Sequence, residues 1–215
     1  MTSGSKTWLL LCGLILSLCA NASAPEDAIT ARALVTSLGR PAPSSTPFAE
    51  ARFMKMLDQP LVVSGQLAWL GGDRLERRVE HPGNEVSTIA DGEVTQQRDG
   101  HEVRRFSLKR APQLQLLLDS FVALLGGDPT RLEQAFTIRR DAVDATRWSL
   151  ILTPRDPRLA QAVSQVQIDG RGNEPRCMRM QEADGDLTID LLGELAARMP
   201  PAPTREALAT LCAGG

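Results

Sequence analysis

The stretch FAEARFMKMLDQPLVVSGQLAWLGGDRLERRVEHPG, residues 48–83, contains three short segments rich in apolar residues. In its second segment four apolar residues at odd positions share one face: Leu61, Val63, Leu67 and Trp69. A period of two is typical of a β-strand with one buried face. Gly72-Asp73 predicts a tight turn before the third segment, in which Leu75 and Val79 again share a face. The stretch therefore predicts the first three strands of an antiparallel meander.

The first segment adds two unusual pairs to this pattern. Met54 and Met56 are expected on one strand face, and Met178 and Met180 repeat this spacing later in the chain. Methionine is flexible and polarizable, which suits a surface that accepts varied apolar ligands. An ordinary filled core is the alternative interpretation.

Glu50 and Arg52 form the second pair and also share a strand face. We consider two interpretations, a polar group inside a cavity and a salt bridge at the rim of the sheet. A rim salt bridge would contribute only a few tenths of a kcal/mol. The effect of replacing Glu50 therefore distinguishes the two.

The rest of the chain extends this meander and interrupts it once. Two Asp-Gly dipeptides predict further hairpins, at residues 91–92 and 99–100, so the meander runs from about residue 48 to 108. Residues 111–128, APQLQLLLDSFVALLGGD, place Leu117 and Phe121 on an apolar helical stripe. Asp128 and Pro129 predict the start of a second, short helix. Strands resume from about residue 135 to 192.

A further helix is predicted over residues 25–38, ahead of the first meander. The order is then helix, meander, helix pair and meander. This order predicts an α+β domain in which an incomplete antiparallel β-barrel, a curled sheet, wraps around central helices.

The N-terminus predicts a cleaved signal peptide over residues 1–22. Lys6 precedes an uncharged apolar run, residues 8–20, and small residues follow it. The run is shorter than the roughly 20 residues of a membrane span. With cleavage after Ala22 we expect export to an oxidising compartment, a single domain over residues 25–198, and a proline-rich tail over residues 199–215. A retained anchor and lipidation of Cys19 are the alternatives.

Charge and cysteine content limit the function classes further. The net charge of −2 leaves no concentrated cationic face for a nucleic acid. Cys177 and Cys212 would remain after cleavage, and an oxidising compartment favours a disulfide between them. One buried thiol and one exposed thiol are the alternative.

Residues that carry chemistry are scarce. His81 and His101 have no cysteine or second histidine at ligand spacing, so we expect no metal site. No G-x-S-x-G elbow and no phosphate-binding glycine pattern is present in the sequence. We therefore expect a protein that is not an enzyme and uses no cofactor.

Residues 48–95 and 159–186 resemble the periplasmic outer-membrane lipoprotein carriers, the LolA-like family. The order of the strands and of the Asp-Gly turns carries the resemblance, including the predicted hairpins at residues 169–170 and 184–185. The first block is also similar to the LolA-related subgroup associated with aryl-polyene and fatty-acyl gene clusters. One departure concerns an arginine that the classical carriers place before their third strand, where this chain has Gly71-Gly72-Asp73. The role of that arginine is therefore assigned to no residue of this chain. The expected cargo is accordingly an acyl lipid in general and not a lipoprotein in particular.

The resemblance implies a monomeric carrier that binds acyl chains in a hydrophobic cavity, with an inner-membrane donor protein and an outer-membrane acceptor. A membrane-anchored acceptor of the LolB type, and a non-catalytic envelope assembly protein with a filled core, are the alternatives. The residues expected to line the cavity are Met54, Met56, Leu67, Trp69, Leu117, Phe121 and Leu150.

Overall fold

The computed structural model describes residues 24–214, so the predicted signal peptide and Cys19 lie outside the described residues. Its elements follow the predicted order of helix, meander, helix pair and meander. The helices are α1 (Ala24–Leu38), η1 (Leu108–Arg110), α2 (Pro112–Leu125), α3 (Pro129–Leu132), α4 (Pro157–Ala160), η2 (Gly193–Arg198) and α5 (Arg205–Cys212). The strands are β1 (Ser44–Phe53), β2 (Leu61–Gly71), β3 (Arg74–His81), β4 (Glu85–Ala90), β5 (Glu93–Arg98), β6 (Arg104–Ser107), β7 (Phe136–Ala142), β8 (Arg147–Pro154), β9 (Val163–Arg171), β10 (Glu174–Glu182) and β11 (Leu187–Leu192).

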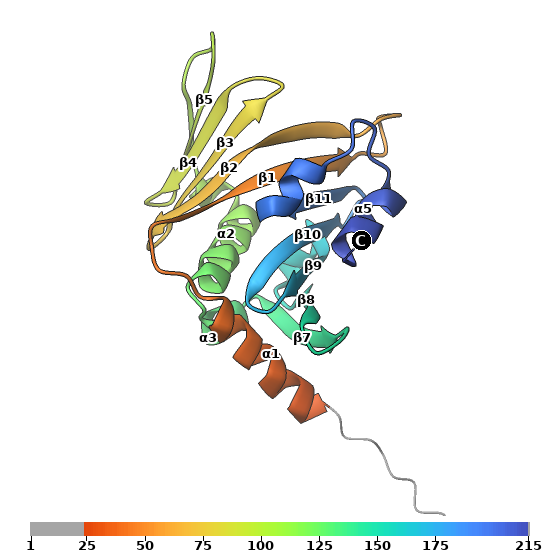
Figure 1. Ribbon diagram of the computed structural model, residues 1–215. Coiled ribbons are helices and arrows are strands. Elements are labelled where there is room, and N and C mark those ends of the chain that lie inside the picture. The colour runs from red at the N-terminus through yellow and green to blue at the C-terminus, as the bar shows by residue number, and fades with distance from the viewer. Residues whose placement is uncertain (1–23, 215) are drawn as a thin grey trace, which may run out of the picture.

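The eleven strands of residues 24–214 form one antiparallel sheet, in the order β6-β5-β4-β3-β2-β1-β11-β10-β9-β8-β7. The two meanders are joined where β1 pairs with β11. The sheet curls but does not close (Figure 1), and the strand order makes β6 and β7 its two edges. The predicted fold class, an incomplete barrel formed by a curled sheet, is confirmed.

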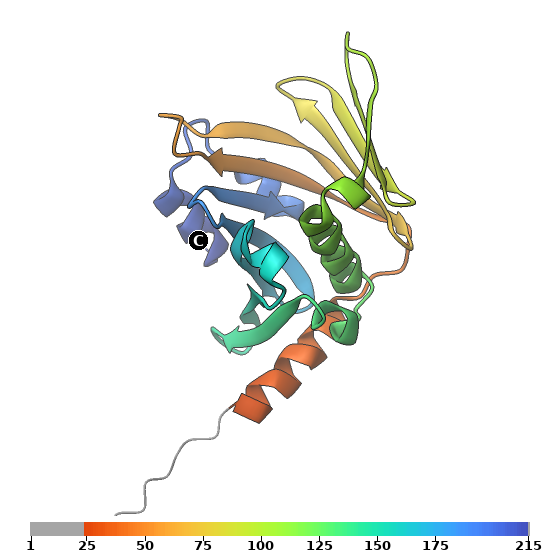
Figure 2. The ribbon, with the colours of Figure 1, turned by 180° about the vertical axis from the view of Figure 1, so that it is seen from behind.

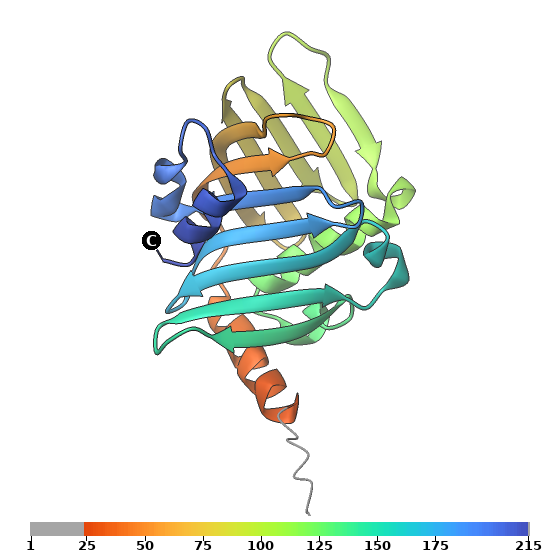
Figure 3. The ribbon, with the colours of Figure 1, turned by 90° about the vertical axis from the view of Figure 1, so that its right-hand side faces the viewer.

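The helices cover the two faces of the sheet differently. Figures 1 and 2 show α2 inside the curve, between the strands of the two meanders, with α1 beside β7. Figure 3 shows the C-terminal helices η2 and α5, in blue, on the outer side of the sheet. The face toward α2 is called the concave face below, and the opposite face the convex face.

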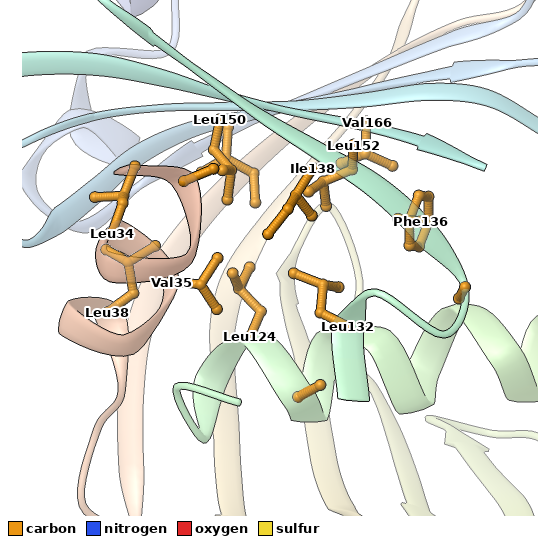
Figure 4. Packing of buried hydrophobic residues seen from close by; sticks show 14 of the residues in the cluster. Leu34, Val35, Leu38, Leu124, Leu132, Phe136, Ile138, Leu150, Leu152 and Val166 are labelled. Atoms are coloured by element: carbon orange, nitrogen blue, oxygen red, sulfur yellow. The ribbon is translucent and has the colours of Figure 1, made fainter. Parts of the chain in front are cut away.

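The larger core lies under the second meander, where α1, α2 and α3 pack on the concave face of β7–β10 (Figure 4). Val35, Leu132, Phe136 and Leu152 are fully buried there. Asp128 caps α3 as predicted, because its carboxylate accepts a hydrogen bond from the backbone N–H of Arg131 at 3.0 Å. The helix pair is therefore fixed to the second meander.

A smaller core holds the C-terminal segment on the convex face. Leu195 and Leu208 pack there against Ile189 and Leu191 of β11. A disulfide joins Cys177 of β10 to Cys212 of α5, with 5.5 Å between their Cα atoms. Much of the predicted tail is thus packed against the sheet.

Of the two hairpin turns predicted in the second meander, the structure confirms one and moves the other. The turn at residues 184–185 is confirmed, but Asp169 and Gly170 lie inside β9 and not at a hairpin. A Cβ atom on Gly170 would lie 2.2 Å from Cζ2 of Trp148, so this glycine is needed beneath the indole ring. The hairpin forms at residues 172–173 instead, where Gly172 has a φ of +59°.

Candidate functional site

The concave face of the first meander is apolar along one complete row. Directly paired residues cross five strands in succession: Trp69, Leu75, Ile89, Val94 and Phe106. Directly paired residues share a face of the sheet. This row faces α2, because a Cβ atom on Gly126, at the end of that helix, would lie 4.0 Å from the ring of Trp69.

The opposite face of β3 is polar, since Arg74, Glu76, Arg78 and Glu80 alternate with the inward residues. The alternation predicted for this strand is confirmed. Several large apolar side chains of the row are nevertheless only half-buried, and Phe106 is 43% exposed. The concave face of the first meander thus presents apolar area that the fold itself does not fully cover.

Helix α2 carries more apolar surface than it buries. Leu116, Leu117, Leu118 and Phe121 are all only half-buried, although the helix lies inside the curve. Beside its first half is a pocket of about 150 Å³, lined by Gln113, Leu114, Leu117, Leu159, Ala162, Val163, Met180 and Glu182. A helix with incompletely packed leucines and a neighbouring apolar pocket is suited to binding an apolar ligand.

The structure brings some of the predicted lining residues together and separates others. Leu67 and Trp69 lie on β2, half-buried, and Leu117 forms part of the pocket wall. Phe121 lies one helical turn further along α2. Leu150 is fully buried in the larger core and is not among the residues that line the pocket.

The prediction that Met54 and Met56 share a strand face is wrong. Strand β1 ends at Phe53, and both methionines lie in the connection to β2. Met54 is half-buried, whereas Met56 is 80% exposed. The backbone N–H of Lys55 donates to the carboxylate of Asp186, so the chain turns here before the alternation can continue.

A cluster of charged residues lies in the middle of the concave face. Glu50 forms an ion pair with Arg77 of β3, at 3.0 Å, and not with Arg52. Glu50 is also the direct partner of Asp190 across β1 and β11. Asp190 is 5% exposed, and burial, followed by the nearby Glu50 carboxylate, raises its pKa to about 8. Arg77 and Arg52 act in the opposite direction on this pKa.

Sequence reasoning missed most of this cluster. Asp190 is an isolated acid in the otherwise apolar strand LTIDLL, which was a usable signal for a buried polar site. Its neighbour Thr188 shares the same face. The contact with Glu50 joins residues from opposite ends of the domain, and no local pattern predicts it.

The model of one protein family, described as the outer membrane lipoprotein carrier protein LolA-like family, matches residues 22–215. The chain belongs to this family. The resemblance that the sequence suggested is therefore confirmed. None of the curated proteins matches this LolA-like chain significantly.

Several solved structures are similar to the LolA-like chain. A LolA superfamily protein, NE2245 from Nitrosomonas europaea, is 11% identical to this chain, with a TM-score of 0.40. The match covers 78% of this chain and 92% of the NE2245 chain. A putative outer membrane lipoprotein-sorting protein domain from Vibrio parahaemolyticus is 10% identical, with a TM-score of 0.43, covering 86% and 99%. LprF from Mycobacterium bovis is 13% identical, with a TM-score of 0.37, covering 83% and 98%.

Two further observations concern the described part of this LolA-like chain. Within residues 24–214, no helix is long and apolar enough to cross a membrane. The same residues contain no group of three or more histidine, cysteine or acidic side chains that could hold a metal ion.

Proposed function

We propose that this chain is a periplasmic carrier that holds the acyl chains of lipoproteins or other lipids between α2 and the concave face of its sheet. The observation that carries the proposal is the apolar row from Trp69 to Phe106, which faces inward and yet is incompletely buried. Membership of a family of carriers supports it. Met54, Leu67, Trp69, Leu117 and Phe121 are the partly buried apolar residues, among those predicted from the sequence, that we propose to contact cargo.

Because the pocket is small, we propose that α2 moves when cargo binds. A cavity of about 150 Å³ is the size that accommodates a molecule such as benzene, which is much smaller than a long acyl chain. Each methylene that leaves water contributes about 0.8 kcal/mol. A long chain therefore supplies free energy that acts against the cost of displacing α2 from the concave face.

The remaining parts of the proposal concern the route of the cargo. The chain is exported with removal of residues 1–22 and acts as a monomer without covalent chemistry. It receives cargo from an inner-membrane donor protein and releases it to an outer-membrane acceptor. Cys19 is removed with the signal peptide in this account.

A non-catalytic envelope assembly protein with a filled core is the second candidate. The modest volume of the pocket, about 150 Å³, favours this candidate, because a protein whose core is filled by its own side chains leaves only small pockets. The two candidates differ in whether α2 leaves the concave face in the presence of an acyl ligand.

Uptake of a fluorescent fatty acid by the purified mature chain tests the proposal. We expect saturable uptake, weakened about tenfold by Leu117→Gln, which places an amide in the pocket wall. Leu70→Gln is the matched control, because Leu70 is exposed and lies on β2 outside the apolar row. No uptake by the unmodified chain, or equal losses in the two variants, would contradict the proposal.

A further inference from the structure

Four buried side-chain polar atoms of the described residues have no hydrogen-bond partner, and two of them belong to residues that are directly paired on the concave face, Arg52 and Thr188. The Nε–H of Arg52 and the hydroxyl of Thr188 are buried, and neither forms a hydrogen bond within residues 24–214. The two residues are direct partners across β1 and β11. Thr188 is only 3% exposed. Since buried polar groups are nearly always hydrogen bonded, this pair points to a ligand that supplies an acceptor.

The charge of the surrounding cluster also favours an anionic ligand. Glu50 and Arg77 neutralise each other through their ion pair. Burial, followed by the nearby Glu50 carboxylate, raises the pKa of Asp190 and so favours its uncharged form. Arg52 takes part in none of the ion pairs of the described residues, and its buried Nε–H has no hydrogen-bond acceptor there.

The unpartnered atoms lie next to the apolar pocket. Thr188 is the direct partner of Met180 across β10 and β11, and Met180 lines the pocket together with Leu117 of α2. Paired residues of adjacent strands have Cβ atoms about 4.5–5.5 Å apart. The polar pair Arg52 and Thr188 and the apolar pocket residue Met180 therefore lie next to one another in one row across the sheet.

The first turn of α2 and the side chain of Glu182 both line this pocket. Gln113 and Leu114 belong to the first turn of α2 and line the pocket. No side chain caps the N-terminus of this helix. The N-terminal end of a helix favours negative charge, so this end of α2 favours an anionic group beside the pocket, whereas a charged Glu182 in the pocket wall acts against one.

We propose that Arg52 and Thr188 bind the carboxylate of a single-chain fatty acid whose acyl tail enters the pocket beside Met180 and Leu117. This inference rests on the proposed carrier function and adds to it the class of head group. The guanidinium of Arg52 and the hydroxyl of Thr188 both donate to the carboxylate oxygens, which makes the bonds charge-assisted. A neutral head group offers the guanidinium of Arg52 no negative charge.

Comparison of dodecanoate with dodecan-1-ol tests the inference, because the two share the same alkyl tail. Their affinities for the full mature chain at pH 7 are measured by displacement of a fluorescent fatty-acid probe. We expect dodecanoate to bind about tenfold to a hundredfold more tightly. Arg52→Gln abolishes this preference, whereas Arg52→Lys retains part of it. Arg74→Gln is the control, since Arg74 is exposed at the start of β3 and lies on the convex face.

Thr188→Val separates a ligand role from a structural role. The substitution removes a buried hydroxyl that has no partner, so it leaves the resistance to urea unfolding unchanged or increases it. We nevertheless expect the preference for dodecanoate to fall several-fold. A variant that loses stability but keeps the preference would show that the hydroxyl serves the fold and would overturn its assignment to the ligand.

The remaining outcomes distinguish this inference from the carrier proposal. Equal affinities for the acid and the alcohol, or a preference that persists in Arg52→Gln, overturn the carboxylate site and leave the carrier function intact. Absence of binding by both compounds contradicts the carrier function and the carboxylate site together. If Arg52→Gln does not fold, Thr188→Val and Arg52→Lys decide the same question.

Discussion

The carboxylate of Glu50 and the guanidinium of Arg77 meet on the concave face, with 3.0 Å between Oε2 and Nη2. The pair connects β1 to β3 across the intervening β2. Arg77 also lies over the ring of Phe48, with its Cζ atom 4.9 Å from the ring centroid. Glu50 is thus part of the interior, and the rim salt bridge with Arg52 does not form.

Replacing Glu50 should destabilise the protein through this interior position. Glu50→Gln leaves Arg77 without its anion, and we expect a loss of about 1–3 kcal/mol in the free energy of unfolding. Glu76→Gln is the matched control, because Glu76 pairs with Arg78 on the convex face, where the effect should stay below about 1 kcal/mol. Urea unfolding measures the loss of stability in both variants. Equally small losses would mean that the ion pair of Glu50 contributes no more than a salt bridge at the rim of the sheet.

Asp190 should make the stability of the protein depend on pH. Its pKa is about 8 in the folded chain, compared with about 4 in an unfolded one. Between these values the folded state binds the additional proton, so the stability falls as the pH rises. Asp190→Asn keeps the side chain neutral and should flatten this dependence. Urea unfolding at several pH values across the window measures it, and an unchanged slope would contradict the assignment.

The disulfide should stabilise the C-terminal segment and the sheet together. Cys177 and Cys212 are 35 residues apart in sequence, and a crosslink of this loop length contributes about 4 kcal/mol in the chain-entropy account. Reduction should lower the midpoint of urea unfolding. The double variant Cys177→Ala/Cys212→Ala is the control, since it should be insensitive to reductant. A midpoint that does not change on reduction would indicate that the bond is not formed.

Gly65 is required for the pairing of β2 with β3. A Cβ atom at this position would lie 1.9 Å from the carbonyl oxygen of Arg78, at the point where the register shifts. Gly65→Ala should therefore destabilise the protein by about 3 kcal/mol or more. Gly83→Ala is the control, because no atom lies within 4 Å of its Cβ position. Thermal unfolding compares the two, and similar midpoints would refute the close approach.

The local elements of the fold were predictable from the sequence because each has a local cause. The turns at residues 72–73 and 91–92 follow from residues that adopt positive φ, as Gly72, Asp91 and Gly92 do. The helix over residues 112–125 follows from an apolar stripe that ends at two glycines. These features depend on a few neighbouring residues, and the structure confirms them.

The site was less predictable because it depends on pairing between distant strands. The register that places Glu50 opposite Asp190 and Arg52 opposite Thr188 joins the start of the domain to its end. The sequence pattern indicates which side chains share a face, but not which strand lies alongside. Leu150 illustrates the same limit, since it lies on the concave face as a lining residue would, yet the helices bury it completely.

The lipid content of the protein, purified from the periplasm without detergent, tests the carrier account most directly. Organic extraction followed by mass spectrometry identifies any bound molecule and its ratio to protein. The account predicts a molecule with at least one acyl chain, close to one equivalent, that is depleted in Leu117→Gln but not in Leu70→Gln. Protein that is free of lipid and takes up no fatty acid when it is offered would contradict the account and favour a filled core.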